Sequence, residues 1–389
     1  MKIAYIHSNK KVGTGAHYIN DLIVAKLREH DVEVESFYPQ FSLIDAPVHF
    51  KGMNNILFFY SLLEKRDKIL KCDIIQGTTY TPIAFMRFSK PVVSHFGSTN
   101  IGFLKAVPTT GNLEKECLDI FYALKQAGAI SEINLKTLRP INDIATIEHY
   151  AAEKADFVVA TSEIVKKNLI DDGIAPKKIE VIYNAIEDYW FDQTEQVFAT
   201  TPAIIFLGRI GEDSFTLKLK GLDRLIYLYQ KFPEVKKLSF VMSRNKNLIN
   251  WLKETIPNHH IESNVTKTDI PGKIANQAGN ILLITSRYEG FSLSLIEGMS
   301  QGLIPITFPV GVAPEIIRDG ENGFLVNSIY EAEEKIKLLL NDAELRKTLS
   351  KNARNTTIQF KSEVLALKML ELYKKINDNY KLMNPGRQS

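Results

Sequence analysis

The feature that most limits the fold of this 389-residue chain is a repeated alternation of short apolar runs with longer amphipathic segments. Runs such as Pro91–His95 and Asp156–Thr161 are largely apolar at consecutive positions rather than at every second one. Strands of this kind are buried on both faces, which requires helices on both sides of a parallel sheet. The sequence therefore predicts a doubly wound α/β fold, beginning with a strand at Lys2–His7 and a helix at Tyr18–Arg28.

The alternation is interrupted at the polar and small residues of Asp192–Thr201 and then starts again. We place the domain boundary there, with a first domain at residues 1–192, a second at 193–361, and a C-terminal helix at 362–380 that packs back on the first. Ligands of open α/β sheets bind at the carboxyl ends of the strands. Two facing domains of this type predict a binding site in the cleft between them.

Composition and charge exclude several classes of partner. The net charge is +3, from 48 basic and 45 acidic side chains, which argues against a nucleic-acid binder. Cys72 and Cys117 stand far apart without metal-ligand spacing, so neither a disulfide framework nor a zinc site is predicted. The sequence shows no signal-peptide core and no apolar stretch of about 18 residues. We expect a cytoplasmic protein.

A helix predicted within residues 54–71 has two interpretations. It combines apolar side chains such as Phe58, Phe59 and Leu62 with a basic end that includes Lys65 and Lys68. Helices of this composition can lie on an anionic membrane surface, which would give peripheral contact with the inner face of the membrane. The alternative is a helix packed on the sheet with a solvated end.

The segment 281–326 has the pattern of a ligand site. A buried strand ends at Ser286, Gly290 permits a tight turn, and a helix opens near Ser292, so free N–H groups and a positive dipole end face the site. We predict that an anionic or hydroxyl-rich ligand is held by the backbone of Gly290, Phe291, Ser292 and Leu293.

Glu289 and Glu297 flank the start of this helix, eight residues or about 12 Å apart at roughly 1.5 Å per residue. Carboxylates so far apart cannot share one reacting centre. They could accept hydrogen bonds from hydroxyls at both ends of an elongated ligand, such as the sugar and the ribose of a nucleotide sugar. The alternative is that an exposed helix carries two unrelated glutamates.

These motifs, taken together, resemble the retaining glycosyltransferases of family 4, which have two Rossmann-like domains in the GT-B architecture. The resemblance rests on Glu-x7-Glu with Gly-Phe between, on PEII-x-DG-x-NGFLV at 314–326, on FLGRI at 206–210 with KGLDRLI at 220–226, and on residues 155–186. It extends over nearly the whole chain. It implies transfer of a hexosyl unit from a nucleoside-diphosphate sugar, with UDP favoured over GDP, to a glycan, lipid-linked or small-molecule acceptor.

The resemblance also implies roles for individual residues. Glu289 would bind the donor sugar and Glu297 the ribose, while Arg209 and Lys220 would neutralise the diphosphate, a leaving group whose charge grows as the bond breaks. His95, at the end of an apolar strand, would lie beside the acceptor and the transferred sugar. The predicted catalytic residues are His95, Glu289, Arg209 and Lys220, and the loop with Gly13 and Gly15 is predicted to contact the donor.

One departure from the family pattern leaves a choice open. The residues EDSFTLKL widen the gap between Arg209 and Lys220, so Lys218 competes with Lys220 for the diphosphate. A further alternative is that these lysines are merely solvated. A lone His such as His95 is otherwise more often a core residue.

Other features bear on cofactors and on competing functions. Position 18 is Tyr, so the dinucleotide fingerprint is absent, and no Asp-x-Asp triplet supplies a metal clamp. We predict an enzyme without cofactor or metal. The resemblance implies front-face transfer, in which the departing phosphate accepts the acceptor's proton. The competing hypotheses are a nucleotide-sugar epimerase and a non-catalytic sugar-binding scaffold. The acceptor is expected to contact the loops of Asn100–Asn142 in the first domain.

Overall fold

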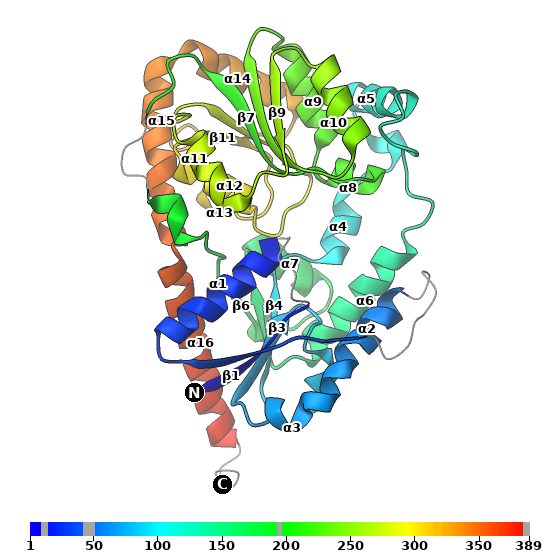
Figure 1. Cartoon of the computed structure of the whole chain (residues 1–389), viewed down its shortest axis with the longest axis vertical. Helices are drawn as coiled ribbons and strands as arrows, with labels where there is room; N and C mark the ends of the chain where they lie inside the picture. Colours follow the sequence, from blue (N-terminus) through cyan, green and yellow to red (C-terminus); the bar gives the residue numbers. More distant parts are fainter. Residues whose placement is uncertain (9–14, 42–50, 193–196, 384–389) are drawn as a thin grey trace. The chain divides into compact units, whose positions relative to one another are not determined.

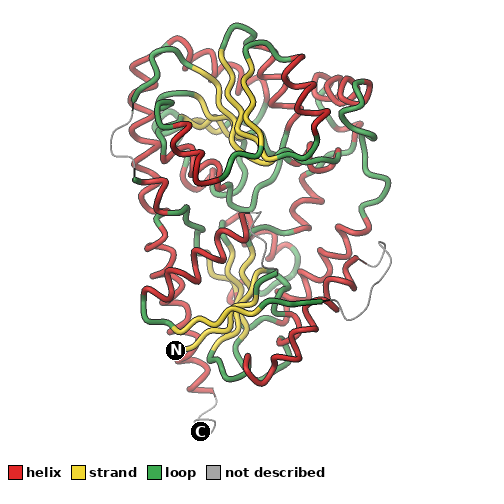
Figure 2. The backbone as a smooth tube through the Cα atoms, in the orientation of Figure 1, coloured by secondary structure: helices red, strands yellow, loops and turns green. Residues whose placement is uncertain are grey.

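The computed structural model describes residues 1–8, 15–41, 51–192 and 197–383. Its contacts divide the chain into two units. Unit 1 consists of Met1–Leu104, Thr137–Glu187 and Phe360–Ser389, and unit 2 of Lys105–Lys136 and Asp188–Gln359. Each unit has a six-stranded parallel sheet with helices around it (Figures 1 and 2). The prediction of two Rossmann-like domains is confirmed.

The sheet of unit 1 has the strand order β2-β1-β3-β4-β5-β6, and every pairing is parallel. Its central strand β4 is buried at all five positions, as the apolar run predicts. The strand order reverses between β1 and β3, which makes their carboxyl ends the topological switch point of this sheet. The strands are β1 (Lys2–Ile6), β2 (Glu33–Phe37), β3 (Ile74–Thr78), β4 (Val92–Phe96), β5 (Phe157–Ala160) and β6 (Ile179–Val181).

The helices of unit 1 pack on this sheet through apolar faces. A typical start is that of α7, where Ser162 caps the helix by accepting a hydrogen bond from the Val165 amide at 3.2 Å. The helices are α1 (Gly15–Glu29), α2 (Lys51–Tyr60), α3 (Arg66–Ile69), α6 (Arg139–Lys154), α7 (Glu163–Asp171) and α16 (Ser362–Met383); α4 (Asn100–Ala106) continues from unit 1 into unit 2.

The C-terminal helix α16 belongs to unit 1, as predicted, and packs beside α1. Its inner face buries residues such as Leu365, Met369 and Leu372. One polar contact fixes its position: the hydroxyl of buried Tyr373 donates to Oε1 of Gln76 on β3 at 2.5 Å. Burial raises the pKa of this tyrosine well above its usual value, so it remains a donor.

The predicted helix at 54–71 is divided into α2, a 3₁₀ turn at Ser61–Lys65, and α3. Phe59 and Leu62 are buried in the core of unit 1, and Ile56, Phe58 and Leu63 are partly buried against it. Most of the apolar side chains that suggested a membrane face are therefore used in packing. Among the described residues, no helix is long and apolar enough to cross a bilayer.

The sheet of unit 2 has the order β12-β11-β10-β7-β8-β9, again with parallel pairing throughout. The order reverses between β7 and β10, so the switch point of this sheet lies at their carboxyl ends. The strands are β7 (Ala203–Arg209), β8 (Lys236–Met242), β9 (His259–Ser263), β10 (Ile281–Ile284), β11 (Ile304–Thr307) and β12 (Phe324–Leu325).

The helices of unit 2 include one from an unexpected part of the chain. They are α5 (Lys115–Gln126), α8 (Ser214–Leu219), α9 (Leu222–Lys231), α10 (Lys246–Thr255), α11 (Ile270–Ile274), α12 (Leu293–Ser300), α13 (Ala313–Ile316), α14 (Ile329–Asn341) and α15 (Ala343–Thr356). Helix α5 packs beside α9 (Figure 1). Both of the chain's cysteines are free and buried, Cys72 in unit 1 and Cys117 on α5.

The position of α5 corrects the predicted domain ranges. Residues 105–136 were expected in the first domain, as part of the acceptor loops, but they group with unit 2. The physical reason is the apolar face of α5, where Cys117, Ile120, Phe121 and Leu124 are all buried. Unit 2 otherwise begins at Asp188 rather than 193, and the chain returns to unit 1 at Phe360.

Candidate functional site

The predicted donor-binding residues of unit 2 gather at the switch point of its sheet. Arg209 is the last residue of β7, and the turn Ser286–Glu289 follows β10. The two strands are neighbours, with Ile204 opposite Ile281, so their carboxyl ends meet at one edge. Arg209 is exposed there, and its guanidinium makes no ion pair with any described residue.

Lys220 and Glu289, predicted to bind the same ligand, are in direct contact. The Lys220 ammonium lies 2.7 Å from Oε1 of Glu289, and the Ser286 hydroxyl donates to the same oxygen at 2.7 Å. The two side chains are 30% and 17% exposed, so the pair is accessible from solvent. Lys220 therefore has room to move toward a ligand while Ser286 keeps the carboxylate in place.

Helix α12 starts at an unusual backbone position. Ser292, its N-cap, has a φ of 77°, in the left-handed region that non-glycine residues rarely adopt. Its side chain is buried, and its Oγ has no hydrogen-bond partner among the described residues. A buried hydroxyl without a partner at a helix N-terminus is a donor and acceptor ready for an oxygen-rich ligand.

The turn before α12 is held by a close approach of the following loop. The Val312 amide donates to the Phe291 carbonyl at 3.0 Å. Gly311 has a φ of 56°, and a Cβ there would lie 2.4 Å from that carbonyl oxygen. Glycine at 311 is thus required by both conformation and space.

Glu297 is buried on α12 and pairs with a residue that the sequence analysis did not identify. Its Oε1 lies 3.1 Å from the ammonium of Lys267, and the two side chains are only 11% and 13% exposed. Lys267 begins a 3₁₀ turn, Lys267–Asp269, after β9. The two glutamates of the Glu-x7-Glu motif therefore have separate lysine partners.

The C-terminal end of α8 and Lys220, which follows it, are joined to the turn after β10 through three consecutive carbonyl groups. The Lys218 carbonyl accepts from Nη1 of Arg287 at 2.7 Å, that of Leu219 from the Arg287 amide at 2.8 Å, and that of Lys220 from the Thr285 hydroxyl at 3.3 Å. Gly221 follows with a φ of 62°, and a Cβ there would lie 1.9 Å from the Thr285 carbonyl oxygen. These contacts fix the backbone of Lys220 relative to Glu289.

Arg287 is itself held by a buried carboxylate. Its Nη1 and Nη2 lie 2.8 and 2.5 Å from the two oxygens of Asp223, a residue with no exposed surface. Burial acts to lower the pKa of Arg287, but the hydrogen bonds and charge of Asp223 outweigh it, and the net pKa is raised. The arginine remains charged, and the pair has the bidentate geometry typical of strong ion pairs.

Lys218, the competing candidate for the diphosphate, has different surroundings from Lys220. It is buried, and its ammonium donates to Oδ1 of Asn134 at 2.7 Å and to the Pro108 carbonyl at 3.4 Å. It also lies 5.6 Å from the centre of the Phe121 ring. Burial lowers the pKa of Lys218, and the charge of Arg287 lowers it further. Its ammonium is engaged by the protein.

In unit 1, His95 lies on β4, one residue before its carboxyl end. The ring is buried, and Nε2 has no hydrogen-bond partner among the described residues. Burial lowers the pKa of His95 to about 4, so the ring is neutral near pH 7. A neutral imidazole with one unpartnered nitrogen can form a hydrogen bond to a ligand hydroxyl.

Two other predicted features of unit 1 are less informative. His7 follows β1 and is buried, but its Nε2 lies 3.1 Å from the Ser36 hydroxyl and its ring stacks on Tyr38, which is the pattern of a core residue. Gly13 lies outside the described residues, and Gly15 is the first residue of α1.

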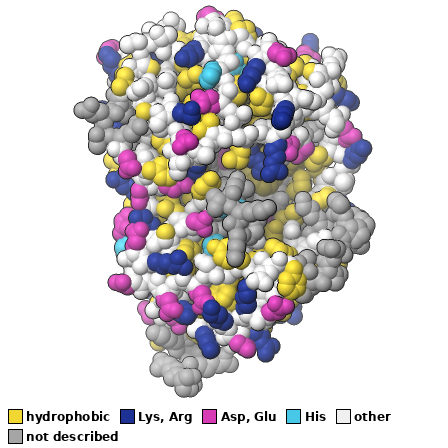
Figure 3. Space-filling model, in the orientation of Figure 1, with side chains coloured by type: hydrophobic (Ala, Val, Ile, Leu, Met, Phe, Trp, Pro, Cys, Tyr) yellow, Lys and Arg dark blue, Asp and Glu magenta, His cyan; other side chains and the backbone are white. Residues whose placement is uncertain are grey.

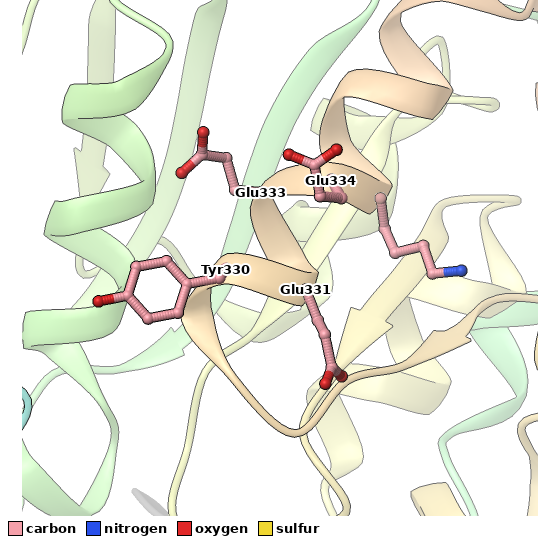
Figure 4. Close-up of a pocket in the computed structure, with 5 residues that line it drawn as sticks. Tyr330, Glu331, Glu333 and Glu334 are labelled. Carbon is pink, nitrogen blue, oxygen red and sulfur yellow. The ribbon is translucent and has the colours of Figure 1, made fainter.

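A hollow of about 400 Å³ occurs on unit 2 away from these groups (Figure 4). It is lined by Tyr330, Glu331, Glu333, Glu334 and Lys335 of α14. The Tyr330 hydroxyl donates to Glu116, and the carboxylates of Glu333 and Glu334 lie within 2.9 Å of the Lys337 ammonium. None of the predicted site residues lines it. On the face shown in Figure 3, basic and acidic side chains are interspersed.

Comparison with protein families agrees with this geometry. Residues 22–188 match the family described as Glycosyltransferase Family 4, and residues 191–356 match the family described as Glycosyl transferases group 1. Two glycosyltransferase family models thus match successive parts of the chain, each over somewhat less than half of its length. The GT-B architecture expected from the resemblance is confirmed by the fold, and family 4 is consistent with both matches.

The chain also has curated relatives over part of its length. It is 28% identical over 240 residues to an uncharacterised glycosyltransferase of Methanocaldococcus jannaschii, an alignment that covers 59% of this chain and 62% of the relative. Alignments with the first three curated relatives span between 50% and 62% of their lengths.

Solved structures resemble the chain over nearly its whole length. Sucrose-phosphate synthase from Thermosynechococcus elongatus has a TM-score of 0.71 at 16% identity, with 96% of this chain and 98% of that chain covered. HepE of Anabaena, solved with UDP and with UDP-glucose, has a TM-score of 0.65 at 16% identity, with 96% and 100% covered. At these identities the likeness concerns the fold.

Proposed function

We propose that this protein transfers a hexosyl unit from a UDP-sugar, in preference to a GDP-sugar, to a glycan, lipid-linked or small-molecule acceptor with retention of configuration. The observation that carries the proposal is the set of charges at the switch point of unit 2, where Arg209, Lys220 and the start of α12 meet at one edge. Support for the nucleotide comes from HepE, which has this fold and was solved with UDP and UDP-glucose.

The donor is proposed to bind by replacing one ion pair with another. An incoming diphosphate competes with Glu289 for the partly exposed Lys220 ammonium, and Arg209 adds a second positive charge. Glu289, kept in place by the Ser286 hydroxyl, is then available to accept hydrogen bonds from the donor sugar. Negative charge that develops on the leaving diphosphate is met by groups that are already positioned.

The remaining roles follow from burial and charge. Glu297, whose carboxylate also contacts the Lys267 ammonium, would accept hydrogen bonds from the ribose. Neutral His95 would bind a hydroxyl of the sugar or acceptor. Because Glu289 and Glu297 each pair with a different lysine, neither is proposed as nucleophile or general acid, and the departing phosphate would take the acceptor's proton.

Incubation with UDP-, GDP- and ADP-sugars in EDTA, followed by thermal unfolding and product analysis, tests the proposal. A donor at 100 times its dissociation constant should raise the free energy of unfolding by about 2.7 kcal/mol. Release of nucleoside diphosphate with an acceptor extract, and an α-linked product from an α-linked donor, would support retaining transfer. Donor epimerised without acceptor would indicate an epimerase, and binding without turnover would indicate a scaffold.

A further inference from the structure

Residues 105–136, which we call the 105–136 segment, leave unit 1 after Leu104 and return to it at Thr137. Between these points the segment packs on unit 2, with α5 beside α9. An additional helix on a domain surface could serve stability alone. Some of its polar contacts go to Asn245, Asn247 and Tyr330. Others indicate a more specific role, because they reach the end of α8, next to Lys220.

The two ends of the segment meet at one side chain. Asn134 Oδ1 and the Pro108 carbonyl, 26 positions apart in the chain, both accept from the Lys218 ammonium. The Phe121 ring of α5 lies beneath the same ammonium. Lys218 thus binds the start, middle and end of the 105–136 segment.

A second contact of the segment reaches Arg287, which holds the end of α8. The Glu114 carboxylate lies 3.6 Å from Arg224 and 3.7 Å from Arg287. Arg287 in turn binds the Lys218 carbonyl and, through its amide, the Leu219 carbonyl. The side chain and the backbone of Lys218 are therefore both held, two residues before Lys220.

We propose that the 105–136 segment is a positioning element of the donor site, which fixes the C-terminal end of α8 so that the ammonium of Lys220, the residue after this helix, meets the diphosphate. Lys218 acts in this arrangement as the anchor of the segment and makes no contact with the donor. The inference rests on the proposed function, because it assigns the diphosphate to Lys220.

The test compares variants of the full chain by calorimetric titration with uridine, guanosine and adenosine mono- and diphosphates. The readout is the ratio of monophosphate to diphosphate dissociation constants, which isolates the contacts with the second phosphate. Asn134 is exposed, so Asn134→Ala removes its hydrogen bond without opening the core. We expect this ratio to fall about 3- to 10-fold, and Asn134→Asp, which retains an oxygen acceptor, to restore it.

Tyr330→Phe is the matched control. It removes the hydrogen bond from Tyr330 to Glu116, which also joins the 105–136 segment to unit 2 but lies on α14. This variant should keep the wild-type ratio. Matching unfolding temperatures would show that all three variants remain folded.

The outcomes distinguish failure of the positioning role from failure of the proposed function. If Lys220→Ala abolishes the preference for diphosphate and Asn134→Ala leaves it unchanged, or lowers it no more than Tyr330→Phe, the positioning role is overturned while the proposed function stands. If the wild-type protein binds none of the diphosphates in preference to the monophosphates, both are overturned.

Discussion

The carboxyl edges of the two sheets differ in the charge of their polar side chains. In unit 2, Lys220 pairs with Glu289 and Lys267 with Glu297. In unit 1, His95 and His7 are both buried, with pKa values lowered to about 4 by burial. Paired charges can exchange a partner for an anion, whereas neutral imidazole rings favour uncharged hydroxyl groups. Among the described residues, these side chains of the two sheets therefore differ in chemistry.

The largest effect on stability is expected from breaking the buried ion pair between Asp223 and Arg287. Asp223→Ala leaves Arg287 buried without its carboxylate, so the free energy of unfolding should fall by about 3–5 kcal/mol in urea titrations. The double variant Asp223→Leu/Arg287→Met should recover most of the loss. The exposed Glu334→Ala is the control and should cost under about 1 kcal/mol. A small loss for Asp223→Ala would mean that the pair does not support the carboxyl edge of the unit 2 sheet.

Lys220→Ala should lower the transfer rate about 10²- to 10³-fold, because a cation that stabilises the leaving group acts mainly in the transition state. Initial rates at saturating donor measure this, and Lys337→Ala, on the surface of α14, is the control. An increase in KM with kcat unchanged would show that Lys220 contributes only ground-state binding.

Burial of neutral His95 predicts that the free energy of unfolding depends on pH. The pKa of His95 is about 4 in the folded chain and about 6.5 when unfolded, so the unfolded state takes up a proton first as pH falls from 6.5 to 4. Stability present above pH 6.5 is lost over this window, by about 3 kcal/mol in total. His95→Gln should remove this contribution in urea titrations at several pH values. An unaltered slope for His95→Gln would contradict the assignment.

Glu297→Gln should weaken nucleoside-diphosphate binding about 10- to 100-fold while kcat changes little, because ribose hydrogen bonds are alike in the ground and transition states. Titration calorimetry and initial rates separate the two effects. Glu331→Gln, on α14, provides the same change of charge elsewhere on unit 2. A fall in kcat with unchanged affinity would place Glu297 nearer to the reacting bond.

Chelation of divalent metal ions by EDTA is expected to leave the transfer rate unchanged. If Arg209, Lys220 and the start of α12 supply the positive charge, transfer in EDTA should equal transfer in Mg²⁺ or Mn²⁺. Parallel assays in the two buffers measure this. A rate that returns only with added metal would mean that the charged edge of unit 2 is incomplete without an ion.

The fold was predictable because both sheets consist of strands with consecutive apolar residues, such as Ile281–Ile284 and Val92–Phe96. The strand His259–Ser263 was not predicted, since it lies at the sheet edge and only Ile261 is buried. The placement of α5 could not be read from its own residues. Its amphipathic pattern predicts that one face is buried, but the surface it covers lies about 100 residues further along the chain.

The part of the candidate site that lies within one sequence motif was predictable. The part that depends on contacts between residues far apart in the sequence was not. The turn Ser286–Glu289 and the start of α12 follow from the local pattern of strand, glycine and helix. Lys218 and Lys220 stand two positions apart in similar sequence, so only their three-dimensional surroundings distinguish them. Lys267 occurs in a polar loop 30 positions before Glu297 and has no local signal of its own.

The route of the chain through α5 has a consequence for synthesis on the ribosome. Helix α5 emerges about 100 residues before α9, on which it packs. At a synthesis rate of roughly 5–20 residues per second, α9 follows α5 out of the ribosome about 5–20 s later. During this interval Ile120, Phe121 and Leu124 are exposed on the nascent chain.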